Sequence, residues 1–192
     1  GLSRRDTGLD LSDEASIEGQ LSALSGPFDA ILVASGALEI NGARPEKALS
    51  QLTQSAFLDQ FIVNAAGPAL ILKHAPRLLP KDRPSQFAAL SARVGSIGDN
   101  KIGGWYSYRA AKAALNQIIH TGAIELARTH KQAICVALHP GTVQTPFTAK
   151  YLGRHASVPA AQAALNLLSV LEGLGPDKTG QFFDWAGKPV PW

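Results

Sequence analysis

The sequence predicts an α/β fold in which one open parallel sheet lies between helices on both of its faces. Short apolar runs alternate along the chain with longer segments of helical periodicity, and no segment repeats another. The 192 residues, 45% of them hydrophobic, suffice for one domain with a sizeable core. We therefore expect residues 1–192 to form a single domain.

The first predicted elements follow from apolar patterning and cap signals. Residues 7–11 are expected to end a strand, after which Ser12 caps a helix with an acidic first turn. The apolar run at 28–33 is typical of a strand buried on both faces of a parallel sheet. Helical spacing predicts a long helix over 53–79, bent near Pro68. The remaining expected elements are a strand, helix, strand, helix and strand over residues 86–91, 105–128, 132–138, 158–171 and 180–185.

The expected position of the functional residues follows from this strand pattern. Open parallel sheets bind ligands beyond the carboxyl ends of their strands. We therefore expect functional residues in the loops after Val33, Ser91 and Leu138.

Composition argues against several classes of protein. The net charge is +3, but the basic residues are scattered singly, so we expect no nucleic-acid partner. Cys135 is the single cysteine and lies in an apolar run, which excludes a disulfide framework and suits a reducing cytoplasm. No stretch approaches ~20 uninterrupted apolar residues, so we expect no membrane helix. The histidines lack metal-ligand spacing, and we expect no metal.

Tyr108 and Lys112 form the most suggestive pair of side chains. They are four residues apart on a predicted helix, and therefore lie on the same helix face. A tyrosine with an ordinary pKa of about 10 is a poor acid or base near neutrality, but a nearby cation stabilises phenolate and lowers that pKa. The pair is thus a candidate acid/base unit, with an ordinary surface pair as the alternative.

Four motifs in matching order resemble the short-chain dehydrogenase/reductase family over essentially the whole chain. Residues 107–116 match the family's tyrosine/lysine helix, and Asn64 within Phe61-Ile62-Val63-Asn64-Ala65-Ala66-Gly67 matches its helix asparagine. Residues 139–145, His-Pro-Gly-Thr-Val-Gln-Thr, match its proline–glycine turn, and Asp10-Leu11 is similar to the pair that lines the adenine pocket. The resemblance implies a Rossmann-like, doubly wound parallel sheet in a three-layer αβα arrangement.

The same resemblance implies an NAD(P)-dependent oxidoreductase that transfers hydride to or from a small carbonyl or alcohol. Tyr108 would be the acid/base, while Lys112 would hold the ribose hydroxyls and lower the tyrosine pKa. Asn64 would hold a water in the proton relay. Residues 145–157 would form the loop that covers the substrate.

Further cofactor contacts are implied around the strand ends. Gly36 would leave room for close approach of the cofactor. Pro140 and Gly141 would form the turn beside the nicotinamide, whose carboxamide would be held by the backbone of Val143 and the hydroxyl of Thr145.

The amino-terminal part departs from the family pattern. The glycine-rich dinucleotide loop and the first strand are not found in residues 1–192. Residues 3–5 would then end the second strand, where Arg4 can pair with the 2′-phosphate of NADP. We therefore expect NADP, with NAD as the alternative.

The serine of the family is also altered. The family has two serines closing the strand and uses the second, but here the first is Ser91 and the second position is Ala92. Either Ser91 or Ser96 could polarise the substrate carbonyl, and either hydroxyl could instead satisfy loop backbone.

Residues 91–100, 103–106 and 189–192 are similar to the small C-factor-like branch of the family. This branch opens a second hypothesis, a noncatalytic signalling or nucleotide-binding scaffold on the same fold. An isomerase or dehydratase that uses the same tyrosine is a third. By resemblance we also expect a homodimer or homotetramer.

Overall fold

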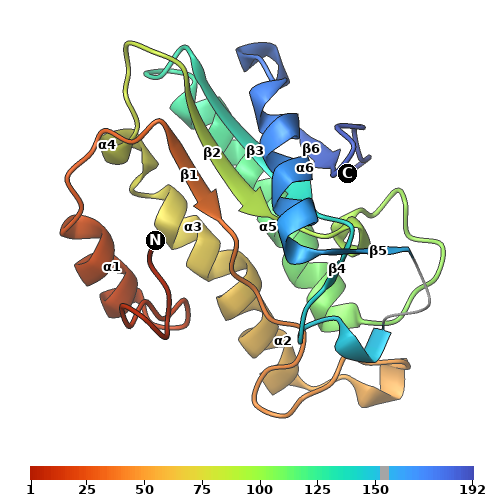
Figure 1. The fold of residues 1–192 in the computed structure, drawn as a ribbon. Helices are drawn as coiled ribbons and strands as arrows, with labels where there is room; N and C mark the ends of the chain where they lie inside the picture. Colours follow the sequence, from red (N-terminus) through yellow and green to blue (C-terminus); the bar gives the residue numbers. More distant parts are fainter. Residues whose placement is uncertain (152–155) are drawn as a thin grey trace.

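A computed structural model describes residues 1–151 and 156–192. Its centre is a parallel, four-stranded sheet in the order β1-β2-β3-β6 (Figure 1). A second, two-stranded parallel sheet pairs β4 with β5 beyond the carboxyl end of β3. The strands are β1 (Ala30–Val33), β2 (Ser85–Leu90), β3 (Ala133–His139), β4 (Thr142–Gln144), β5 (Ser157–Pro159) and β6 (Phe182–Asp184).

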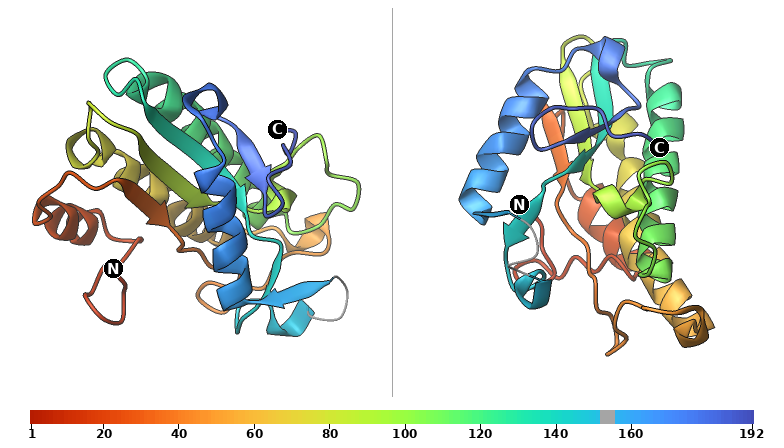
Figure 2. Two further views of the ribbon diagram at one scale, coloured as in Figure 1. Left: turned by 45° about the horizontal axis from the view of Figure 1, so that its top comes forward. Right: turned by 90° about the vertical axis from the view of Figure 1, so that its right-hand side faces the viewer.

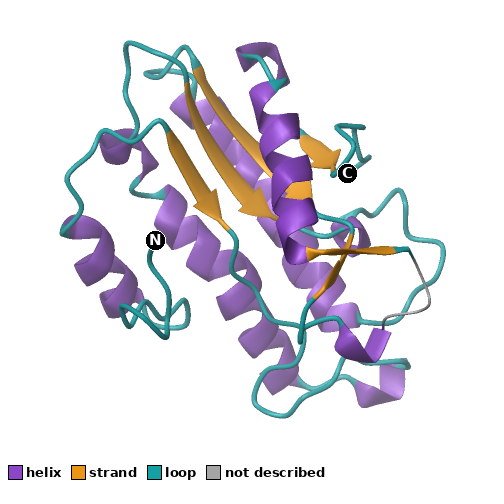
Figure 3. Ribbon diagram, in the orientation of Figure 1, coloured by secondary structure: helices purple, strands orange, loops and turns teal. Residues whose placement is uncertain are grey.

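Helices cover both faces of the main sheet, which confirms the predicted doubly wound α/β fold. Figure 2 shows α3 and α5 on one side of the sheet and α6 on the other, and Figure 3 shows helices in the outer layers. The small α1 packs against α3. The helices are α1 (Glu14–Ser22), α2 (Gln54–Phe61), α3 (Gly67–Leu72), α4 (Ala75–Leu78), α5 (Tyr106–Leu126) and α6 (Ala160–Glu172).

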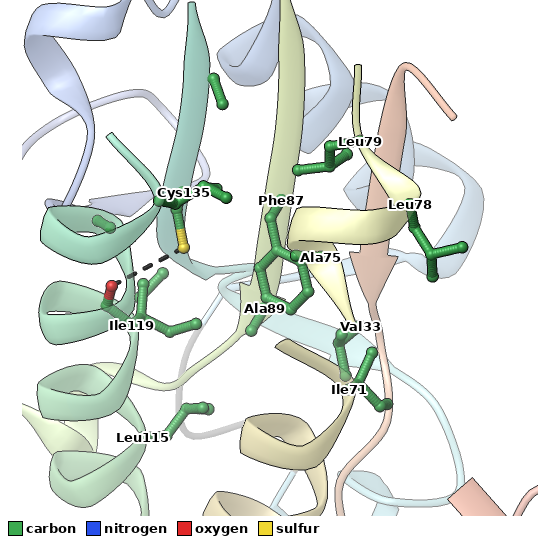
Figure 4. Close-up of a cluster of buried hydrophobic side chains, with 14 of the residues drawn as sticks. Val33, Ile71, Ala75, Leu78, Leu79, Phe87, Ala89, Leu115, Ile119 and Cys135 are labelled. Carbon is green, nitrogen blue, oxygen red and sulfur yellow. Dashed lines mark hydrogen bonds between the residues drawn. The ribbon is translucent and has the colours of Figure 1, made fainter. Parts of the chain in front are cut away.

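Alternation along the central strands explains the two helical layers. Phe87 and Cys135 point into a cluster with α3 and α5, whereas their neighbours Ala88 and Val136 point into a second cluster with α6. Figure 4 shows the first cluster, in which the Cys135 thiol donates to the carbonyl of Ile119 at 3.8 Å. Burial raises the pKa of the Cys135 thiol to about 12, so this thiol is structural and unreactive.

The helix predicted over 53–79 with a bend near Pro68 is found as the helical run Gln54–Leu72, which contains a π turn just before Pro68, and the predicted length is too long because α4 is a separate short helix. A π turn, Ile62–Ala66, separates α2 from α3, and the Gly67 N–H bonds to the carbonyl of Ile62. Pro68 is the physical cause, because it has no N–H to donate to the carbonyl of Asn64 in the α pattern. The turn places Asn64 at full burial in the interior.

The helical run Gln54–Leu72 is long and apolar enough to cross a membrane by length and composition alone. Core helices of globular proteins pass the same test. In this fold the run packs against α5, and two of its buried side chains, Gln60 and Asn64, are polar and hydrogen-bonded. We therefore interpret the run as a core helix.

The amino-terminal segment contains no strand, so the strand expected at 7–11 is wrong, and Arg4 lies in a turn instead of at a strand end. Ser3 and Thr7 satisfy each other locally, since the Ser3 N–H donates to the Thr7 hydroxyl at 3.1 Å and the Thr7 N–H to the Ser3 carbonyl at 3.0 Å. These local bonds occupy backbone groups of the segment, and among the described residues β1 pairs only with β2.

β1 itself is an edge strand, which corrects the expectation of burial on both faces. Leu32 is 46% exposed, while Val33 is buried. The helix that follows the amino-terminal segment is capped by Asp13 instead of Ser12, because the Ser12 hydroxyl bonds to Asp10. The other predicted boundaries of the main-sheet strands, α5 and α6 move by two residues or fewer, including the start of the first strand, which moves from 28 to Ala30. The short β4 and β5 were not predicted.

Candidate active site

Lys112 is a buried ammonium at the carboxyl end of β2. It lies on α5, is 3% exposed, and its Nζ donates to the carbonyl of Leu90 at 2.9 Å. Burial lowers the pKa of Lys112 to about 8. The side chain is therefore largely cationic at pH 7 and loses its proton at a lower pH than an exposed lysine.

Tyr108 lies one turn before Lys112 on the same face of α5, as the spacing predicts. The Lys112 Nζ is 5.9 Å from the centre of the Tyr108 ring. Burial raises the pKa of Tyr108 above its ordinary value, which is opposite to the lowering expected from the neighbouring cation. Desolvation prevails because the ring is only 5% exposed and the ammonium is bonded to Leu90. The phenol therefore keeps its proton at neutral pH.

Asn64 joins this cluster from the π turn. Its Oδ1 accepts from the Ala37 N–H at 3.0 Å, and its Nδ2 donates to the Ala37 carbonyl at 2.8 Å and to Gln60 Oε1 at 2.7 Å. A Cβ on Gly36 would lie 2.9 Å from Asn64 Oδ1 and 3.4 Å from Lys112 Nζ. The structure thus brings Gly36, Asn64 and Lys112 together beside Tyr108.

The two candidate serines are both engaged elsewhere. The Ser91 hydroxyl donates to Asn116 Oδ1 at 2.6 Å, one helical turn beyond Lys112 on α5. The Ser96 hydroxyl donates to the carbonyl of Pro191 and accepts from the Asp99 N–H at 3.1 Å. Both side chains are buried, and neither makes a hydrogen bond to Tyr108 among the contacts of the described residues.

The proline–glycine turn follows β3, where Pro140 and Gly141 lead into β4. Gly141 has a φ of 76°, and a Cβ there would lie 2.9 Å from a ring atom of Trp185, so both conformation and space require glycine. The Thr148 hydroxyl donates to the Val143 carbonyl, and the Thr145 N–H donates back to that hydroxyl at 3.3 Å. Residues 152–155 of the expected substrate-covering loop lie outside the described residues.

None of the three amino-terminal candidates joins the Tyr108 cluster: Arg4 and Asp10 make local contacts, whereas Leu11 packs against α3. Arg4 Nε lies 3.3 Å from Asp10 Oδ2, with the arginine side chain 79% exposed. Hydrogen bonds from Ser12 lower the pKa of Asp10. Leu11 is buried, with its carbonyl 2.7 Å from where a Cβ on Gly67 would lie. Arg4 is therefore paired with Asp10, which sequence reasoning did not foresee.

Sequence reasoning also missed two aromatic rings that flank Tyr108. Trp105 packs edge-on at a centroid distance of 6.3 Å, and Phe147, from the loop after β4, packs at 6.3 Å with an interplanar angle of 57°. Phe147 is 40% exposed. The glycine pair before Trp105 was the only sequence signal for an unusual backbone there, and nothing in the sequence indicated Phe147.

No group of three or more histidine, cysteine, aspartate or glutamate side chains that could hold a metal occurs within residues 1–151 and 156–192. The candidate site therefore consists of a phenol, an ammonium, an amide and a glycine at the carboxyl edge of the sheet.

Comparison with known proteins gives this arrangement a family. A family model described as enoyl-(acyl carrier protein) reductase matches residues 4–171. The C-signal of Myxococcus xanthus is 35% identical over 148 residues, which make up 76% of this chain and 84% of that protein. The chain belongs to the short-chain dehydrogenase/reductase family.

Other members of the short-chain dehydrogenase/reductase family extend the comparison. The 1-hydroxy-2-glutathionyl-2-methyl-3-butene dehydrogenase of Rhodococcus sp. (strain AD45) is 28% identical over 190 residues, covering 97% of this chain and 80% of that protein. The structure of a short-chain dehydrogenase/reductase from Burkholderia multivorans with bound NADP matches with a TM-score of 0.78 at 28% identity, covering 96% of this chain and 75% of that one. The chain is thus a member of an oxidoreductase family.

The residues present fit one end of a nicotinamide cofactor better than the other. Gly36 allows the side chains of Asn64 and Lys112 to approach the backbone after β1, and Gly141 keeps the turn after β3 free of a side chain. At the other end, Arg4 and Asp10 are bonded to each other. The fit is therefore to the nicotinamide and its ribose.

Proposed function

We propose that this protein reduces a small carbonyl compound to its alcohol, with NADP(H) as cofactor and Tyr108 as the proton donor. The observation that carries the proposal is the meeting of Gly36, Asn64 and Lys112 beside the Tyr108 ring. Membership of an oxidoreductase family supports the redox chemistry. When bound, the nicotinamide supplies the hydride.

The electrostatics of the pair fit Tyr108 for proton donation near neutral pH. Burial raises the pKa of Tyr108, so the phenol carries the proton that a reduced carbonyl oxygen needs. Lys112, with a pKa lowered to about 8, is still largely cationic at pH 7 and would donate hydrogen bonds to the ribose hydroxyls. Pro68 has no N–H to donate to the backbone carbonyl of Asn64 in the α-helical pattern. This carbonyl would accept a hydrogen bond from the relay water.

The aromatic rings around Tyr108 indicate which kind of substrate the site would accept. Trp105 and Phe147 flank the phenol, so a carbonyl compound reaching Tyr108 would meet apolar, aromatic surface. This arrangement supports a carbonyl with an apolar substituent over a highly charged one.

Two observations favour NADP as the cofactor: the positive charge of Arg4 and the NADP bound to a similar protein. The Burkholderia multivorans protein was solved with NADP bound, and Arg4 could pair with a 2′-phosphate after releasing Asp10. Exposed ion pairs of this kind contribute only about 0–1 kcal/mol, so the exchange costs little. We propose NADP, with NAD as the alternative.

Ser91 is the candidate for polarising the carbonyl, provided that the substrate oxygen replaces Asn116 as partner of its hydroxyl. Ser91→Ala should then lower kcat by about tenfold or more with substrate saturating. Ser96→Ala is the matched control, since that hydroxyl ties its loop to Pro191. A loss of stability without a loss of kcat in Ser91→Ala would make the hydroxyl structural.

The test of the whole proposal is a titration followed by turnover. NADPH and NADH fluorescence titrations of the protein measure binding, and absorbance at the reduced-nicotinamide band measures consumption with a panel of aliphatic and aromatic aldehydes and ketones. We expect NADPH binding and carbonyl-dependent oxidation. Failure to bind either nucleotide at millimolar concentration would favour a noncatalytic signalling scaffold instead. Binding without turnover would favour a noncatalytic scaffold that binds nucleotide.

We also propose a homodimer or homotetramer in the cytoplasm. Large apolar side chains are exposed on the helices beside the sheet, with Leu58 and Phe61 on α2 and Ile124 on α5 being 54%, 47% and 55% exposed. The single cysteine, Cys135, is free, as in a reducing compartment. Light scattering that gives a monomer mass at micromolar concentration, or fractionation that finds the protein outside the cytoplasm, would contradict these assignments.

A further inference from the structure

The helix that carries Tyr108 begins without a side-chain cap of its own. The residue before α5, Trp105, has no side-chain capping bond, and its indole N–H could only donate. The first N–H groups of any helix lack partners within the helix. The start of α5 therefore depends on acceptors from elsewhere in the chain.

Glu46, in the loop between β1 and α2, supplies these acceptors. Its backbone carbonyl accepts from the Trp105 N–H at 2.5 Å, and its side-chain Oε2 accepts from the Ser107 N–H at 3.3 Å. The side chain is 3% exposed, so the carboxylate sits buried at the positive end of the helix dipole. A residue 61 positions before Ser107 thus caps α5.

The same contacts hold an unusual backbone next to Tyr108. Gly103, Gly104 and Trp105 have successive φ values of 71°, 67° and 55°, all in the left-handed region. From the other side, the Arg109 guanidinium donates to the carbonyls of Gly103 and Gly104 at 3.0 and 2.8 Å. A left-handed tryptophan is unfavourable by itself, so it persists only because its surroundings fix it.

Trp105 is in turn an edge-on neighbour of the Tyr108 ring. Glu46 therefore fixes both the first turn of the helix that carries the phenol and the ring that packs against the phenol. The other carboxylate oxygen, Oε1, is buried and has no hydrogen-bond partner within the part of the chain that the structure describes. Burying such an oxygen is unfavourable for stability, which favours a role beyond holding the fold.

We propose that Glu46 is a positioning residue that sets the orientation of Tyr108 for proton transfer. The inference rests on the proposed reductase function. Small displacements of a reacting group can lower turnover by up to about a hundredfold while leaving cofactor binding intact. Glu46 contacts the start of α5 at Ser107, five residues before Lys112, so the ammonium keeps its bond to Leu90.

Kinetics of three variants test this role. Glu46→Ala should lower kcat by about tenfold or more, with the KM for NADPH changed by less than about twofold. Glu46→Gln keeps a carbonyl oxygen for the Ser107 N–H and should restore most of kcat. Glu125→Ala, an exposed glutamate near the far end of α5, is the matched control and should behave as wild type. The assays are run at a temperature below the unfolding transition of each variant, and circular dichroism measures the folded fraction.

A spectroscopic measurement separates this inference from the proposed function. Glu46→Ala should change the fluorescence of Trp105, and the change should vanish when Trp105 is already replaced by Phe. If the wild type does not turn over, the reductase proposal fails, but the fluorescence still tests whether Glu46 fixes Trp105. An unchanged Trp105 signal, or an unchanged kcat per folded molecule in Glu46→Ala, overturns the positioning role.

Discussion

The carboxyl edge of the sheet and the amino-terminal segment, residues 1–13, both hold polar residues predicted to bind a cofactor, but only at the sheet edge are these polar residues held by long-range contacts. Asn64 bonds to Ala37, 27 residues away, whereas Arg4 and Asp10 pair within six positions on the surface. Long-range, buried contacts hold side chains in one geometry, while local exposed ones are readily exchanged. The difference suggests a preformed nicotinamide end and an adaptable amino-terminal end.

The largest difference in stability between the two regions is expected on removal of the Asn64 side chain, which makes several hydrogen bonds. Asn64→Ala leaves the Ala37 N–H, the Ala37 carbonyl and the amide oxygen of Gln60 without their partner, so the free energy of unfolding should fall by about 2–4 kcal/mol. Asp10→Ala, at the amino-terminal end, should lower it by less than about 1 kcal/mol. Urea unfolding of both variants measures the contrast, and equal losses would mean that the two regions are held alike.

A pH series isolates the buried ammonium. Burial lowers the pKa of Lys112 from 10.5 to about 8, so between these pH values the unfolded chain holds a proton that the folded chain has released. The contribution of Lys112 to the unfolding free energy should therefore rise from pH 8 toward pH 10, by about 2 kcal/mol. Denaturant unfolding of wild type against Lys112→Met at pH 7.5 and pH 9.5 measures it. A difference between the two proteins that is independent of pH would show that the ammonium is not desolvated.

Replacing each of two glycines by alanine should change the stability of the protein in opposite directions. Gly36→Ala places a Cβ 2.9 Å from Asn64 Oδ1 and should destabilise the protein by about 1–3 kcal/mol while weakening NADPH binding. Gly19 lies inside α1 with open space around it, so Gly19→Ala should stabilise by about 0.5–1 kcal/mol. Thermal unfolding checks both signs. An unchanged melting temperature in Gly36→Ala would mean that the side chains around Gly36 move aside at little cost in free energy.

The smallest effect is expected at the surface of the amino-terminal segment. Arg4→Ala breaks an exposed ion pair and should change the unfolding free energy by less than about 0.5 kcal/mol. If Arg4 meets a 2′-phosphate, the same variant should nevertheless reduce the preference for NADPH over NADH. An unchanged preference, measured as the ratio of the two KM values, would remove Arg4 from the cofactor site.

The sequence predicted the parts of the molecule that follow from periodicity and from the family's motifs. The helix expected at 105–128 is found at Tyr106–Leu126 because it is long, periodic and free of proline. The shared face of Tyr108 and Lys112 follows from helical spacing alone. The four strands of the main sheet and the helices between them were likewise predicted in the right order, since each of these strands contains an apolar run.

What the sequence did not predict depends on contacts between distant segments. The strand expected at 7–11 would have needed a neighbouring strand, and the raised pKa of Tyr108 reflects burial that no local pattern encodes. The cap that Glu46 provides for α5 joins two loops far apart in the chain. The π turn before Gly67 was partly readable, because Pro68 signalled a disturbance but not its form.

The central claim is that a neutral phenol at Tyr108 gives its proton to the carbonyl oxygen. Tyr108→Phe keeps the ring and removes that proton, and Tyr106→Phe, two residues earlier on α5, is its matched control. With NADPH and a carbonyl substrate saturating, we predict that kcat falls by about a hundredfold or more in Tyr108→Phe and stays at the wild-type value in Tyr106→Phe. Undiminished turnover in Tyr108→Phe would contradict the account.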